Sequence, residues 1–112
     1  MLICNNATAG QAAVDDCGDL ERKGQTLYVR GELDFDSVSA LLDATEPLFA
    51  SDPPTHIDLS GVIRANSAGI ALLVEWLIQA RRHGQEPTFI NVPAQMRAII
   101  AIADLDSILP LA

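Results

Sequence analysis

Apolar residues with a regular spacing first occur in two short runs, 20–23 and 26–30, with Gly24 between them. In the second run, Leu27 and Val29 alternate with more polar neighbours, which is the period of a half-buried strand. We therefore expect the domain to begin with two strands in a hairpin-like arrangement.

Apolar residues then recur every three or four positions from 37 to 50, as on one face of a helix. Asp34 or Asp36 is expected to cap this helix, because a carboxylate can accept hydrogen bonds from the free N–H groups of its first turn. Pro47 lies inside the pattern and is expected to end or kink the helix, since proline lacks an N–H. Residues 51–54, Ser-Asp-Pro-Pro, break the pattern.

A β-compatible run at 55–59 leads through a polar, glycine-containing connection into a long apolar helical pattern that ends at residues 81–84. We expect a loop over residues 62–68, with Asn66 and Ser67 at the helix start. Both are good N-cap residues, so the simple interpretation is that one of them caps the helix.

A second interpretation is that Ser67 is presented for phosphorylation or for a partner protein. The neighbouring Ala68 and Gly69 are too small to shield its hydroxyl. A phosphate there would be favoured by the free N–H groups and the positive dipole end of the helix.

The remaining residues predict a strand at 87–92 and a helix that begins at Pro93, a tolerated first position. A short edge strand could follow at 105–110. The apolar side of this last helix is assigned to Met96, Ile99, Ile100, Ile102 and Ala103. The element order is β-β-α-β-α-β-α, which indicates an α/β fold with a mixed sheet covered mainly on one side by helices.

The central helix is apolar over more of its circumference than one sheet face requires. Leu72 and Trp76 fall outside the sheet-facing arc. Either the flanking helices bury them, or one of them joins Ser67 in a docking surface, as tryptophan often does at interfaces. The sheet-facing arc consists of Ile70, Leu73, Val74 and Leu77.

Composition limits the possible functions. The chain of 112 residues has room for one domain, expected over residues 19–112 after a flexible extension at 1–18. Its formal charge of −8 argues against binding nucleic acid and favours, at most, a basic protein partner. Cys4 and Cys17 have no metal-ligand spacing and are expected to be free thiols in a reducing compartment.

No catalytic or cofactor motif is present in the sequence. His56 and His83 have no acidic partner at a recognisable spacing, and Ser67 lacks a Gly-x-Ser-x-Gly elbow. A Walker-type loop and a metal-ligand cluster are also absent from the sequence. We expect no enzyme activity, cofactor or metal. The N-terminus does not resemble a signal peptide and no stretch is long enough to span a bilayer, so a cytoplasmic protein is expected.

Residues 58–62, Asp-Leu-Ser-Gly-Val, and 66–73, Asn-Ser-Ala-Gly-Ile-Ala-Leu-Leu, resemble the signature of STAS domains. These small domains occur in anti-sigma-factor antagonists and in the tails of sulfate transporters. Residues 31–34, Gly-Glu-Leu-Asp, resemble the run that follows their second strand. The resemblance implies the STAS fold and places the regulatory hydroxyl of the family at Ser67, with Asn66 where the family usually has an acidic residue.

Within that family, residues 20–112 are most similar to the MlaB-type subunits of ABC phospholipid transporters, and Arg64 adds to the likeness. These subunits carry threonine at the Ser67 position. The resemblance implies a non-catalytic subunit that binds the ATPase within a complex that contains a permease. Such transporters maintain the lipid asymmetry of the outer membrane, and the protein would then lie at the inner membrane through its partners.

Two alternatives stay open. The chain could be an anti-sigma-factor antagonist that binds an anti-sigma kinase until Ser67 is phosphorylated. It could also be a free-standing STAS domain for a lipid or nucleotide, supported only by the apolar surplus near Leu72 and Trp76. For the subunit, contacts are expected through Arg64, Asn66, Ser67, Ala68, Gly69, Leu72 and Trp76.

Overall fold

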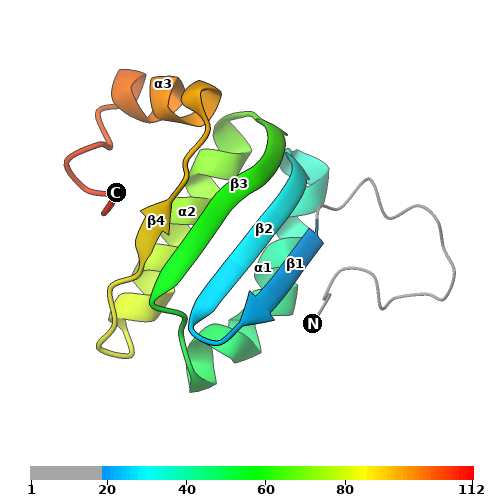
Figure 1. Cartoon of the computed structure of the whole chain (residues 1–112), viewed down its shortest axis with the longest axis vertical. Coiled ribbons are helices and arrows are strands. Elements are labelled where there is room, and N and C mark those ends of the chain that lie inside the picture. The colour runs from blue at the N-terminus through cyan, green and yellow to red at the C-terminus, as the bar shows by residue number, and fades with distance from the viewer. Residues whose placement is uncertain (1–18) are drawn as a thin grey trace, which may run out of the picture.

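A computed structural model describes residues 19–112 as four strands and three helices in the expected order (Figure 1). The elements are β1 (Asp19–Lys23), β2 (Thr26–Leu33), α1 (Phe35–Ser51), β3 (His56–Ala65), α2 (Ser67–Arg81), β4 (Thr88–Ile90) and α3 (Ala94–Ile102). The expectations for the 1–18 extension and for Cys4 and Cys17 lie outside the described residues.

The strands form one mixed sheet in the order β1-β2-β3-β4. β1 pairs antiparallel with β2, whereas β2–β3 and β3–β4 are parallel. In Figure 1, α1 and α2 lie behind the sheet, and α3 lies beside the upper ends of β3 and β4. The expected α/β architecture, with helices mainly on one side of a mixed sheet, is confirmed.

Trp76 links α2 to α1 in the core. Its ring stacks on Phe49 with a centroid distance of 5.9 Å, and its Nε1 donates a hydrogen bond of 2.9 Å to Thr45 Oγ1. The Thr45 hydroxyl in turn donates to the Leu41 carbonyl oxygen at 2.7 Å. The indole N–H, which would be costly to bury without an acceptor, is therefore satisfied inside the core.

The strand before α2 is longer than predicted. β3 continues to Ala65, so most of the expected 62–68 loop is strand and only Asn66 separates β3 from α2. The prediction failed because the polar residues have a partner strand: β2 also runs on, to Leu33, and pairs with this part of β3. Two register shifts, between Tyr28 and Arg30 and between Gly31 and Glu32, each leave an extra residue on β3 without ending the pairing.

Helix α1 also differs from its prediction. Asp34 is the N-cap and accepts hydrogen bonds from the backbone N–H groups of Asp36 and Ser37, so the first of the two expected caps is confirmed. Pro47 does not end the helix, which continues to Ser51. Because Pro47 is exposed, the backbone carbonyl oxygen that loses its helical partner there can hydrogen-bond to water instead.

The C-terminal third departs from the expectations in four details. β4 has only three residues, and Pro93 is the N-cap of α3 rather than its first helical residue. Two residues assigned to the apolar side of α3 are exposed: Ile102, at 86%, faces away from the buried pair Met96 and Ile100, and Ala103 is the C-cap that follows the helix. The residues at 105–110 form turns, and the sheet edge is met instead by an isolated parallel bridge from Phe89 to Leu111.

Candidate partner-docking site

Ser67 is the first residue of α2, and its side chain is exposed. Asn66 is the N-cap of α2, because its side-chain oxygen accepts a hydrogen bond of 2.8 Å from the backbone N–H of Ala68. The Ser67 hydroxyl is therefore not used for capping. The first turn of α2 contains no acidic residue, so no side-chain carboxylate there offsets the positive end of the helix dipole.

Tight packing fixes the position of this helix start. The backbone N–H of Asn66 donates a 3.1 Å hydrogen bond to the Leu33 carbonyl oxygen. A Cβ atom added at Gly69 would lie 2.9 Å from the Leu33 Cβ and 3.1 Å from the Ala65 Cβ. Gly69 thus allows the helix to approach the ends of β2 and β3.

Arg64 lies on the same end of the domain and is also exposed. Its guanidinium forms an ion pair of 2.7 Å with Glu32 on the neighbouring strand β2. Such surface ion pairs contribute little to stability. The pair therefore leaves Arg64 accessible to another molecule, beside Asn66 and Ser67.

Two exposed apolar side chains at this end were missed in the sequence. Phe35 and Ile63 are 71% and 77% exposed. Leu33 pairs with Ala65, so the residues just after β2 and those near the end of β3 lie side by side. The sequence does contain one signal for the exposure of Phe35. It is a large apolar residue between Asp34 and Asp36 in a first helical turn. We name the set Phe35, Ile63, Arg64, Asn66 and Ser67 the Ser67 surface.

Leu72 and Trp76 do not belong to an exposed surface. Both are 0% exposed, and the contacts of Trp76 with Phe49 and Thr45 on α1 use its ring and its N–H group. The interpretation that flanking elements bury the surplus apolar side of α2 therefore holds for these two residues. The docking expectation for them is wrong, because α1 covers the side of α2 that carries Trp76. Ala68 is likewise buried.

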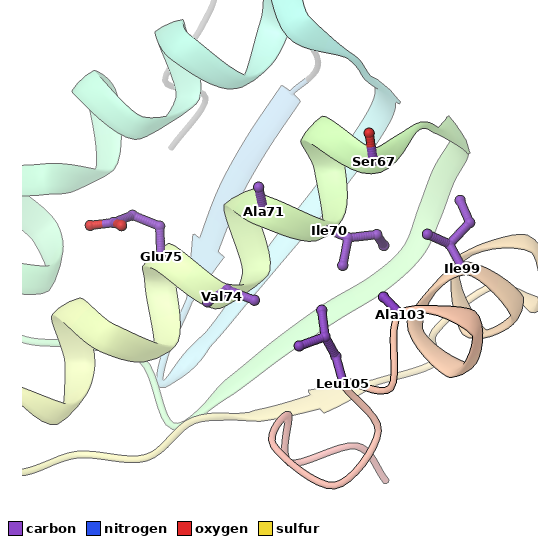
Figure 2. A pocket seen from close by; sticks show the side chains of 8 residues that line it. All are labelled: Ser67, Ile70, Ala71, Val74, Glu75, Ile99, Ala103 and Leu105. Atoms are coloured by element: carbon purple, nitrogen blue, oxygen red, sulfur yellow. The ribbon is translucent and has the colours of Figure 1, made fainter.

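An apolar groove runs between α2 and the end of α3, with a volume of about 480 Å³. Figure 2 shows Ile70 and Val74 of α2 directed across it toward Ile99 and Leu105, with Ser67 at its upper end. The groove therefore meets the Ser67 surface at Ser67. The complete lining is Ser67, Ile70, Ala71, Val74, Glu75, Ile99, Ala103 and Leu105.

Asp58, part of the signature, has a structural position rather than one on the Ser67 surface. Its carboxylate accepts hydrogen bonds from the Ser60 backbone N–H at 2.8 Å and from Asn91 Nδ2 at 3.0 Å. Burial alone would raise the pKa of Asp58, but the hydrogen bonds from Ser60 and Asn91 outweigh it and hold the pKa below 3.8. The ionised carboxylate connects β3 to the residue that follows β4.

Within residues 19–112, no three His, Cys, Asp or Glu side chains come together as a metal site. In the same part of the chain, no helix is long and apolar enough to cross a bilayer.

Comparison with known proteins identifies the family. A family model described as "Mlab, STAS domain" matches residues 18–110. The chain belongs to this STAS-domain family. No curated protein sequence matches it at a significant level.

The fold of this STAS domain is shared with solved anti-sigma factor antagonists. One from Mycobacterium paratuberculosis is 24% identical with a TM-score of 0.66, over 84% of this chain and 82% of the other. A putative one from Thermotoga maritima is 14% identical with a TM-score of 0.66, over 82% of each chain. Phosphorylated SpoIIAA from Bacillus is 19% identical with a TM-score of 0.64, over 86% and 91%. At these identities the likeness supports the fold alone.

Proposed function

We propose that this STAS domain is a non-catalytic subunit of an ABC-type phospholipid transporter. In this role it binds the cytoplasmic ATPase through the Ser67 surface and supports assembly of the complex with its permease. The observation that carries the proposal is the match over residues 18–110 to a family described by the name Mlab. The transport would serve the lipid asymmetry of the outer membrane.

The chemistry of the Ser67 surface supports a protein partner. Exposed Phe35 and Ile63 offer apolar contact area at the same end of the sheet as a cation, an amide and a hydroxyl. A mixture of large apolar groups with a few polar ones is typical of interface centres. Binding there would favour one conformation of the ATPase only if its affinity differed between the two ATPase states.

A pull-down of the tagged chain from its own cells, followed by mass spectrometry, tests this function. The wild-type chain is expected to recover an ABC ATPase and its permease, and Ser67→Glu to lose both because it adds charge to the contact. Ser51→Glu is the matched control, since Ser51 is an exposed serine at the opposite end of α1. Recovery of no ATPase with wild type, or equal recovery with Ser67→Glu, would contradict the proposal.

The second candidate function is an anti-sigma-factor antagonist switched by phosphorylation of Ser67. An exposed hydroxyl at the first position of α2, with no acidic residue in that turn, favours it. A phosphate would be stabilised by the helix terminus while changing the charge of the Ser67 surface. Recovery of an anti-sigma kinase by wild type, lost with Ser67→Glu, would support this candidate instead of the transporter subunit.

A further inference from the structure

We propose that the α2–α3 groove binds apolar side chains carried on a basic amphipathic helix of a partner protein. This proposal specifies a second partner contact within the proposed function. It rests on that function only because it assumes that the occupant is part of a protein. It adds a second contact area, distinct from Phe35, Ile63 and Arg64, and it specifies the chemistry of what binds there.

The groove has an apolar lining that the domain covers only in part, since Ile70 is buried but Val74, Ile99 and Leu105 are half-buried. Ile70 and Val74 form one wall, and Ile99 and Leu105 form the other (Figure 2). Ile102 extends this apolar area. It lies three residues after Ile99, hence on a neighbouring position of α3, and is 86% exposed. An exposed apolar area of this kind is typical of a binding site.

The rim of the groove is acidic at its Leu105 side. Exposed Asp104 and Asp106 stand on either side of the lining residue Leu105. Glu75 also contributes to the lining, but Figure 2 shows its carboxylate directed away from Leu105, and Gln79 Nε2 donates to it at 3.4 Å. None of the lining residues is basic. The cation of α3, Arg97, donates instead to the backbone oxygen of Ala112 at 3.1 Å.

Charge decides between the possible occupants. A carboxylate rim repels the phosphate groups of phospholipids, and the whole chain carries a formal charge of −8. Lysine or arginine side chains beside the apolar anchors would be attracted to the same rim. An amphipathic helix supplies both, with anchors three or four positions apart on one face and cations at its border.

Selection from a random peptide display library against the full chain tests the proposal without requiring the partner's identity. The expected result is enrichment of peptides with apolar residues three or four positions apart beside Lys or Arg. Ala71→Glu and Ala103→Glu place a charge in the groove at exposed positions and should each weaken the selected peptides at least about tenfold. The matched control is Ala40→Glu on exposed α1 surface, which should not weaken them.

A charge test uses the same peptides. Asp106→Lys should weaken binding of the basic peptides, and raising the salt concentration should do so with the wild-type chain. Selection of acidic or uncharged peptides, no enrichment, or binding unaffected by Ala71→Glu and Ala103→Glu would overturn the proposal. Each variant's folding is checked by the fluorescence of the buried Trp76.

Binding of the chain to vesicles of phosphatidylcholine with phosphatidylglycerol is the competing outcome. Flotation of the wild-type chain with such vesicles, lost with Ala71→Glu, would assign the groove to lipid and overturn the protein assignment. Failure of the pull-down to recover an ATPase would remove the transporter function but would not affect the peptide result. The two proposals can therefore fail separately.

Discussion

At the scale of single residues, Asp58 shows how a signature residue can be structural. Its buried carboxylate is kept ionised by hydrogen bonds from Ser60 and Asn91. The acidic residue at the start of the signature therefore joins β3 to the end of the neighbouring strand β4. A role in direct partner contact is not needed to explain why an acid suits this position.

The stability contributed by Asp58 should depend on pH. Because its pKa is lower in the folded protein than the ordinary 3.8, this stabilisation is fully present above that value. It is lost as the pH falls through the lower folded-state pKa. Asp58→Asn should lower the free energy of unfolding by about 1–2 kcal/mol near neutral pH, with a smaller loss in acid.

Urea unfolding of wild type and Asp58→Asn at neutral and acidic pH, followed by Trp76 fluorescence, measures this difference. Asp43→Asn, at an exposed position of α1, serves as the control and should change stability little at either pH. An equal loss for Asp58→Asn at both pH values would show that its charge is not responsible.

Gly69 provides a second prediction at this scale. In an open helix, replacing glycine by alanine raises stability by about 1 kcal/mol. Here the added methyl group would lie 2.9 Å from the Leu33 Cβ, so α2 would have to move away from the sheet. We expect Gly69→Ala to lower the free energy of unfolding by about 1–3 kcal/mol. A more stable variant in urea titrations would contradict the close-packing argument.

At the scale of elements, sequence periodicity predicted the number, type and order of the elements because most of them bury one regular face. It could not predict the length of β3, since Gly61 and Arg64 are strand residues only through pairing with β2. The pairing partner lies about 30 residues away in the sequence, and its own extension includes Gly31. Long-range pairing of this kind leaves no local pattern.

The candidate site was predictable in part for the same reason. Asn66 and Ser67 have a local signal, a polar pair before an apolar helix, and the structure places them at that helix start. The burial of Trp76 depends on its contacts with α1, which a helical wheel of α2 alone does not contain. The exposed Ile63 lies in the part of β3 that the sequence pattern did not predict as strand.

Pro47 gives the prediction for helix α1. It stands at an exposed position inside the helix, where it removes one backbone hydrogen bond. Pro47→Ala should raise the free energy of unfolding by about 1–2 kcal/mol, a gain partly offset by greater freedom of the unfolded chain. Thermal and urea unfolding measure it, with Glu46→Ala as the control. A loss of stability would mean that the proline is favourable where it stands.

At the scale of the whole molecule, the features proposed to bind partners lie together. Ser67 belongs both to the Ser67 surface and to the lining of the groove, so one partner could contact both areas at once. Asp58 and the buried Trp76 support the fold away from that surface. Substitutions in the two areas should therefore change partner binding more than stability.

The C-terminal segment closes the β4 edge of the sheet and gives the last prediction. The Phe89 N–H donates to the Pro110 carbonyl oxygen at 2.9 Å, and the Ala112 N–H donates to the Phe89 carbonyl oxygen at 3.0 Å. Deleting residues 110–112 should cost about 1–3 kcal/mol of unfolding free energy and promote self-association, because an unpaired strand edge can pair with another chain. Urea titration and light scattering measure the two effects, with Ala112→Gly, which keeps both hydrogen bonds, as the control. If the shortened chain matched wild type in both measurements, β4 would not need this cover, and the edge would be protected by its three-residue length alone.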